Sequence, residues 1–120
     1  MWTFNSSNGN LSRDGVLVGT GYSGHESGLN NPTLEDQHNL GPIPRGSWTI
    51  SHFFNDVPGK GPIVAHLSPD EGTETHNRGG FMIHGDNSEH DGSASHGCIV
   101  LPRAIREMIS TSGDSILQVV

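Results

Sequence analysis

The only cysteine of the chain, Cys98, lies in a stretch whose residue types could perform acyl transfer. It follows Ser95, His96 and Gly97, and His84 ends another apolar run on the far side of a polar loop. A thiol with an ordinary pKa of about 8.5 is only a few per cent ionised at neutral pH, so a nucleophilic cysteine needs a base or a positive neighbour. His96, two residues before the cysteine, and His84, across the loop, could each be that base.

Gly97 supports the same chemistry. A residue without a side chain lets a substrate carbonyl come close, and the amides around Gly97 and Cys98 could hold a developing oxyanion. The thiol would attack a carbonyl carbon, a histidine would carry the proton, and a second nucleophile would resolve the thioester. The segment therefore predicts acyl transfer through a covalent intermediate.

These residues require a strand, a loop and a second strand to position them. Apolar residues at 81–84 and 99–101 predict the two strands, and the polar residues between them predict an exposed loop. The chain has 17 Gly, 7 Pro and only 31% hydrophobic residues, a composition that favours short strands joined by tight turns. We expect one mainly β domain over residues 1–120.

The remaining elements follow from turn residues and apolar spacing. Asn8-Gly9 and Asp14-Gly15 predict type I′ turns, because Asn, Asp and Gly tolerate positive φ. Polar residues 23–41 predict a long ordered loop that forms part of a cleft wall. Strands are expected at 2–5, 11–13, 16–22, 47–54, 63–67 and 115–120.

One helix is expected near the C-terminus, over about 102–111. Pro102 suits its first turn, and Gly113 suits its end. Ile105, Met108 and Ile109 have the spacing of a buried helix face.

Charge and hydropathy exclude other classes of protein. The net charge is −7, with only six scattered Lys and Arg residues, which argues against nucleic-acid binding. No stretch approaches the roughly 18 apolar residues of a membrane span. The N-terminus, MWTFNSSNGN, has no basic start and no apolar core, so we expect no export signal of the usual kind. A single cysteine forms no internal disulfide and leaves the compartment open.

Two motifs resemble a known family. Ile83-His84-Gly85, followed by Ser95-His96-Gly97-Cys98-Ile99, resembles the signature of the L,D-transpeptidase (YkuD-like) catalytic domain. The compact type VI secretion L,D-transpeptidase effectors are the most similar group. Further features carry this likeness: Tyr22-Ser23-Gly24, Asn31-Pro32, Gly41-Pro42-Ile43-Pro44-Arg45-Gly46, His84-Gly85-Asp86 and Leu101-Pro102.

The resemblance implies a mainly β YkuD-like fold that acts on the stem peptide of peptidoglycan without a metal or cofactor. The bond cleaved would join the L-centre of a diamino acid to the following D-alanine. Water as acceptor gives L,D-carboxypeptidase action, a free D-amino acid gives exchange, and a second stem amine gives a cross-link. The sequence leaves open the acceptor, the preferred diamino acid and the oligomeric state.

The resemblance also implies roles for individual residues. Cys98 would be the nucleophile and His84 the base, oriented by the carbonyl of Gly85, with Asp86 as an alternative. The site around the thiol would be built by Ser95, His96 and Gly97. Spacing alone does not decide whether His84 or His96 is the base.

One departure from the family pattern concerns the substrate. Many cell-wall members carry Arg or Asn two residues after the cysteine, whereas this chain has Val100. The contact to a substrate carboxylate would then come from elsewhere, and Arg78 and Arg103 are the candidates. Tyr22 and Asp86 are further candidates for substrate binding, although Tyr22 equally suits a packing role.

The likeness to effectors implies partners and a place of action. A peptidoglycan enzyme without an export signal needs another route to its substrate. We expect delivery by a secretion-apparatus carrier into the periplasm of a target bacterium, where it would act as an antibacterial toxin, and a neutralising immunity protein.

Two alternatives come from other classes of protein. A zinc-dependent cell-wall peptidase would use His84 and Asp91, near Asp86, His90 and His96. No His element follows Cys98 to complete such a site, and no H-E-x-x-H motif occurs. The second alternative is a non-catalytic wall-binding or phage-structural module in which Cys98 is merely buried.

Overall fold

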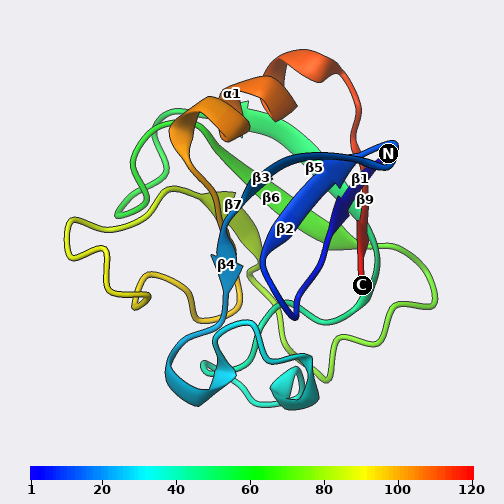
Figure 1. Ribbon diagram of the computed structural model, residues 1–120, viewed down its shortest axis with the longest axis vertical. Helices are drawn as coiled ribbons and strands as arrows, with labels where there is room; N and C mark the ends of the chain where they lie inside the picture. Colours follow the sequence, from blue (N-terminus) through cyan, green and yellow to red (C-terminus); the bar gives the residue numbers. More distant parts are fainter.

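A computed structural model describes all residues, 1–120, and its strands join into a single nine-stranded sheet with one α-helix. The sheet order is β3-β2-β1-β9-β5-β6-β7-β8-β4 (Figure 1). The expected mainly β fold with one C-terminal helix is therefore confirmed. The elements are β1 (Trp2–Phe4), β2 (Asn10–Arg13), β3 (Val16–Thr20), β4 (Tyr22–Ser23), β5 (Gly46–Phe54), β6 (Val64–Pro69), β7 (Met82–His84), β8 (Ile99–Val100), α1 (Arg103–Ser112) and β9 (Ile116–Val119).

The two edges of the sheet are consecutive in the chain, so the sheet curls almost closed. β3 pairs with β2, and β4, which begins after Gly21, pairs with β8. A Cβ atom at Gly21 would lie 1.9 Å from the carbonyl oxygen of Val100, so this crossing needs a glycine. The Gly21 N–H donates to the carbonyl of Gly9 at 2.8 Å. The passage between the edges is thus tied to both neighbouring segments.

The curled sheet encloses an apolar core beneath α1. Trp48 is fully buried, and Phe81 packs edge-on against it with ring centroids 5.1 Å apart. Ile109 of α1 belongs to this core, and Ile105 packs partly against it. The other core residues are Trp2, Phe4, Leu11, Ile43, Ile50, Ala65, Leu67, Ile83, Ile99, Leu101, Leu117 and Val119.

One of the two predicted type I′ turns is present. Asp14 and Gly15 have φ values of 49° and 86°, as a type I′ turn requires. The prediction at Asn8-Gly9 is wrong, because only Gly9 has positive φ there. The N–H groups of Asn8 and Gly9 both donate to the carbonyl of Asn5, whose side chain also accepts from the N–H of Ser7. Asn5 therefore closes a longer turn.

The predicted polar loop 23–41 is irregular, apart from two short 3₁₀ turns, Glu26–Gly28 and Pro32–Leu34. No helix of the structure is long and apolar enough to cross a membrane. The only α-helix, α1, has ten residues.

The expectation for the buried face of α1 is partly wrong. Met108 is 51% exposed, whereas Arg106 is only 7% exposed. The helix turns this face inward because Nε of Arg106 donates to the carbonyl of Leu101 at 3.0 Å, and Nη1 donates to the carbonyls of Pro62 and Ile63. Pro102 is the N-cap and not a first-turn residue, while Gly113 ends the helix with φ 72°, as expected.

Replacing Arg106 by Met should lower the free energy of unfolding by at least about 2 kcal/mol, because three backbone carbonyls would lose their donor. Urea denaturation monitored by circular dichroism measures this change. Arg103→Met is the matched control, since Arg103 is exposed and bonds only to Glu107. The control should cost less than about 1 kcal/mol. Equal effects of the two substitutions would contradict the structural role of Arg106.

Candidate active site

Strand pairing brings Cys98 and His84 to one face of adjacent strands. β7 and β8 run parallel, with Ile83 opposite Ile99 and His84 opposite Val100. Ile83 and Ile99 belong to the core, and successive residues of a strand point to opposite faces. His84 therefore lies on the other face, and Cys98, the residue directly before β8, continues the alternation onto that face, diagonal to His84. The core pattern of two short strands fixes this arrangement.

His84 is held in one tautomer. Its Nδ1 lies 2.7 Å from the carbonyl oxygen of Gly85, and a carbonyl only accepts, so Nδ1 carries the hydrogen and Nε2 keeps a free lone pair. The residue is 3% exposed, and Nε2 is buried with no hydrogen-bond partner. Burial lowers the pKa of His84, with a smaller opposing effect from the Gly85 carbonyl. The side chain is thus a neutral imidazole with one unused basic nitrogen.

Cys98 is a buried, uncharged thiol in this structure. It is 9% exposed, and its Sγ donates to the carbonyl of Gly80 at 3.8 Å, not to His84. Burial raises the pKa of the Cys98 thiol, whereas the Met82 N–H and the positive charges of Lys60 and Arg78 act in the opposite direction. The resting pair therefore consists of a neutral thiol and a neutral imidazole.

Ser95 shapes the turn that carries the thiol. Its buried Oγ donates to the carbonyl of Cys98 at 2.6 Å and accepts from the N–H groups of Gly24 (2.8 Å) and Gly97 (3.1 Å). The Gly97 N–H is therefore occupied, so the expected pair of oxyanion donors is reduced. The Cys98 N–H has no acceptor in the structure and is the donor that remains.

Gly97 is required for a reason other than substrate access. Its φ is 139°, and a Cβ there would lie 2.5 Å from Nη2 of Arg78 and 2.9 Å from the ring of Phe81. The space beside Gly97 is thus filled by protein. This corrects the expectation that a substrate carbonyl uses it.

Two pockets adjoin at the Cys98–His84 face. One, of about 430 Å³, is lined by His84 and Asp86, and the other, of about 190 Å³, is lined by Cys98. Lys60, Ala94 and His96 line both pockets, so we treat them as one groove, the Cys98 groove. The thiol of Cys98 and the neutral imidazole of His84 therefore line one open groove.

Comparison with known families identifies the group to which these features belong. The family model of the Tlde1 domain matches residues 18–115. The chain belongs to the Tlde1 domain family. This is the family of type VI secretion L,D-transpeptidase effectors, so the resemblance seen in the motifs is confirmed, and the family points to an enzyme acting on peptidoglycan. No curated protein matches the chain.

Arg78 of this Tlde1 domain does not face the groove as a substrate ligand. Its two terminal nitrogens donate to four backbone carbonyls, and the guanidinium lies over the ring of Phe81, 5.2 Å from the ring centroid. The residue is 9% exposed. Arg78 therefore joins the loop 23–41 to the cysteine turn, and both of its terminal nitrogens already bond to protein carbonyls. The four acceptors are the carbonyls of Glu35, Gly41, Pro42 and His96.

Tyr22 is hydrogen-bonded to two positions of the loop between His84 and Cys98. The Tyr22 hydroxyl donates to Asp86 Oδ1 at 2.7 Å and accepts from the N–H of Ala94 at 3.2 Å. Burial, together with this bond to Asp86, raises the pKa of Tyr22 to about 12, so the phenol stays protonated. His90 Nδ1 lies 3.4 Å from the second oxygen of Asp86. Tyr22 thus holds both ends of the loop.

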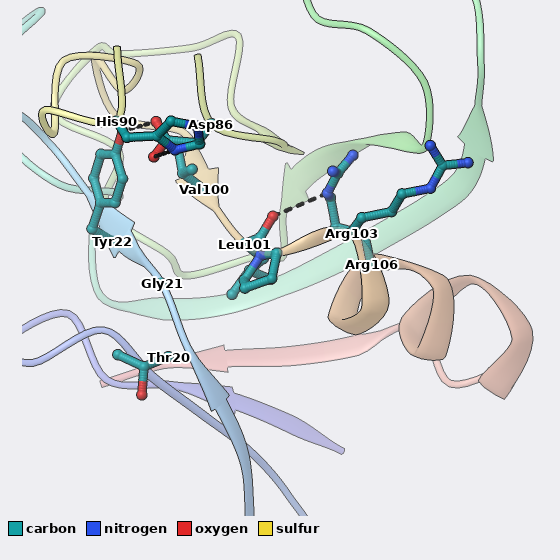
Figure 2. Close-up of a pocket in the computed structure, with 10 residues that line it drawn as sticks. Thr20, Gly21, Tyr22, Asp86, His90, Val100, Leu101, Arg103 and Arg106 are labelled. Atoms are coloured by element: carbon teal, nitrogen blue, oxygen red, sulfur yellow. Dashed lines mark hydrogen bonds and ion pairs between the residues drawn. The ribbon is translucent and has the colours of Figure 1, made fainter. Parts of the chain in front are cut away.

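Tyr22, Asp86 and His90 also line a neighbouring pocket of about 390 Å³, which shares Asp86 with the Cys98 groove (Figure 2). Figure 2 shows Tyr22, Asp86 and His90 grouped on one side of this pocket, with Arg103 and Arg106 on the other. Arg103 lines neither pocket of the Cys98 groove. The structure therefore places this candidate for the substrate carboxylate apart from the thiol.

His96 is fixed on the wall of the Cys98 groove. Its Nδ1 lies 3.2 Å from the carbonyl of Asn39, and its ring meets that of His25 edge-on at 4.6 Å. Unlike His84, it is exposed to solvent. His96 is close enough to the groove to contact a ligand there, but its imidazole is not buried as that of His84 is.

Sequence reasoning missed Ser23 and Lys60. Ser23 Oγ donates to the carbonyl of Gly97 at 3.0 Å and accepts from the N–H of Ile43 at 2.8 Å, which joins β4 to the cysteine turn. The sequence signal that could have identified Ser23 was its position in the Tyr22-Ser23-Gly24 motif, which carries part of the family resemblance. Lys60 lies in the turn between β5 and β6, and nothing in the sequence of that turn predicts that it lines the same pocket as Cys98. No three His, Cys, Asp or Glu side chains gather in a way that could hold a metal ion, so the zinc alternative has no ligand set here.

The buried state of His84 predicts a pH dependence of stability. Because its pKa is lowered in the folded state, the unfolded chain takes up a proton near the ordinary pKa of about 6.5, at which folded His84 does not. The free energy of unfolding should therefore fall as pH drops below about 6.5, at up to about 1.4 kcal/mol per pH unit, until His84 also becomes protonated.

Urea denaturation between pH 7.5 and pH 5 measures this slope. His84→Gln should have a shallower slope than the wild-type protein, and His66→Gln, a substitution at an exposed position of β6, is the matched control. Identical slopes for His84→Gln and the wild type would contradict the buried neutral imidazole.

Proposed function

We propose that the chain transfers acyl groups of peptidoglycan stem peptides through Cys98, cleaving the L,D bond between the diamino acid and D-alanine. One observation carries this proposal: His84 presents a buried, unpartnered Nε2 on the same sheet face as the only cysteine. A buried polar atom without a partner costs free energy, so its retention indicates a use. Membership of the Tlde1 domain family supplies the substrate class.

The first half-reaction forms the thioester. His84 Nε2 takes the proton of the Cys98 thiol, and the sulfur attacks the carbonyl carbon at the L-centre of the diamino acid. The Cys98 N–H stabilises the negative charge on the carbonyl oxygen. When the carbon–nitrogen bond breaks, His84 returns its proton to the departing amine of D-alanine.

The second half-reaction restores the thiol. An acceptor loses a proton to Nε2 and attacks the thioester carbon, and the Cys98 sulfur leaves and regains that proton. Water as acceptor gives L,D-carboxypeptidase activity, and a free D-amino acid gives exchange. The amine of a second stem gives a cross-link. The groove extends on both sides of His96 and Lys60, and this extent suits acceptors of different size.

The biological setting follows from the family. We infer that the protein acts as an antibacterial effector in the periplasm of a target bacterium, after delivery by a secretion-apparatus carrier. A producing cell exposed to the same activity needs an immunity protein. The groove is the natural surface for such an inhibitor, because covering it blocks both Cys98 and His84.

Release of D-alanine from tetrapeptide-stem muropeptides tests the reaction. Cys98→Ala should abolish release, and His84→Gln should lower its rate by roughly 10²- to 10⁴-fold, the usual contribution of a general base. His96→Gln is the matched control and should retain most activity. Circular dichroism checks that each variant is folded.

The opposite outcome for the two histidines would make His96 the base. Release that persists in Cys98→Ala would remove the thiol from the mechanism. Loss of activity on treatment of the wild-type protein with a chelator would favour the zinc alternative.

A further inference from the structure

Five of the six basic side chains of this acidic chain already have partners in the structure. Three arginines pair with carboxylates, and two are buried against backbone carbonyls. Lys60, the only lysine, has neither an ion pair nor a hydrogen bond from its side chain. The paired residues are Arg13 with Asp114, Arg45 with Glu35, and Arg103 with Glu107, and the buried ones are Arg78 and Arg106.

The turn that carries Lys60 is anchored at several points. The Lys60 N–H donates to the carbonyl of Val57 at 3.2 Å, and Val57 forms an isolated bridge with Gly61. At the base of the turn, the Ile63 N–H donates to Asn55 Oδ1 at 3.0 Å. Arg106 also holds the carbonyls that end the turn. The lysine is therefore presented from a closed loop and not from a free tail.

Lys60 is partly buried, and it lines both the pocket of His84 and the pocket of Cys98. The Cys98 thiol and the His84 imidazole are both uncharged, because burial raises the pKa of the thiol and lowers that of the imidazole. Asp86, the carboxylate that lines the same groove, is bonded to Tyr22 and to the N–H of Asn87, and it lies outside ion-pair distance of Lys60. The groove thus offers one unpaired positive charge next to the reacting groups.

We propose that Lys60 binds the carboxylate of the terminal D-alanine of the stem peptide. This inference rests on the proposed function and deepens it. In the leaving D-alanine, the carboxylate carbon is two bonds from the nitrogen that His84 protonates, so a cation near both His84 and Cys98 is suitably placed. Lys60 thereby supplies the contact to the substrate carboxylate. Arg78 is already bonded to backbone carbonyls, and Arg103 lines the neighbouring pocket.

The proposal predicts a restriction on the substrate. A carboxylate bound by Lys60 must follow directly after the cleaved bond, so the site would select a stem that ends in a single D-alanine. An internal or amidated D-alanine presents no negative charge at that point. Lys60 is then a specificity-determining residue as well as a binding group.

Equilibrium binding to the inactive Cys98→Ala protein tests this role without turnover. The two probes are a tetrapeptide stem with a free D-alanine carboxylate and the same peptide as its carboxamide, both measured by calorimetry. Adding Lys60→Met should weaken binding of the acid about 10-fold or more and change binding of the amide less than about two-fold, as expected for loss of a charged hydrogen bond. Lys60→Arg should restore most of the preference for the acid.

Arg103→Met removes one positive charge from the neighbouring pocket and is the comparison variant. If it lowers the preference for the acid and Lys60→Met does not, the proposal is overturned. Equal weakening of acid and amide by Lys60→Met also overturns it, because the lysine would then contact another part of the peptide.

The diamino acid offers a second source of carboxylate, which a stem containing lysine in its place distinguishes. The effect of Lys60→Met should persist with that stem, and its disappearance would assign Lys60 to the diamino acid and overturn the proposal. Turnover is measured separately: D-alanine release by the wild-type protein tests the proposed function. A Lys60-dependent preference for the acid in the absence of release would leave the carboxylate site standing and remove only the reaction.

Discussion

The lone pair on Nε2 of His84 is buried and has no partner, and the surrounding structure keeps it so. Leaving such an atom unsatisfied costs about 1–3 kcal/mol, which the rest of the fold must offset. The bond from Nδ1–H to the Gly85 carbonyl fixes the tautomer, and burial lowers the pKa of the imidazole so that it stays uncharged. These two effects together keep an uncharged imidazole whose Nε2 has a free lone pair and no hydrogen-bond donor in the structure.

Positioning the thiol beside that imidazole depends on hydrogen bonds between segments that lie far apart in the sequence. The parallel pair β7 and β8 sets the common face. Ser95 and Ser23 then hold the backbone on either side of Cys98, while the buried guanidinium of Arg78 joins the long loop to the same turn. The cysteine is thus supported by the sheet, by the loop 23–41 and by β4. A shift of the backbone in any of these segments would therefore change the position of the thiol.

The sequence was informative wherever local chemistry decides the structure. Apolar runs bounded by turn residues located the strands, Asp14-Gly15 located a type I′ turn, and Gly113 located the end of the helix. The residues that surround Cys98 were recognisable from their motif, and the resemblance implied that the Gly85 carbonyl orients His84.

Side-chain contacts over long sequence separations were not predictable in the same way. Arg106 replaces Met108 on the buried face of α1 because its acceptors come from the turn before β6 and from the segment after β8, which no helical periodicity reveals. Gly97 makes room for Arg78, not for substrate. Lys60 comes next to the thiol only because the β5–β6 turn folds over the groove, a tertiary consequence that spacing in the chain does not contain.

The central claim is that Cys98 carries the acyl group between the two half-reactions. Intact-protein mass spectrometry after acid quenching, with the wild-type protein and a tetrapeptide-stem muropeptide, measures this directly. The account predicts an adduct equal in mass to the muropeptide acyl group without D-alanine, located on Cys98 and removed by hydroxylamine. Release of D-alanine with no adduct at any time point, or an adduct on another residue, would contradict it.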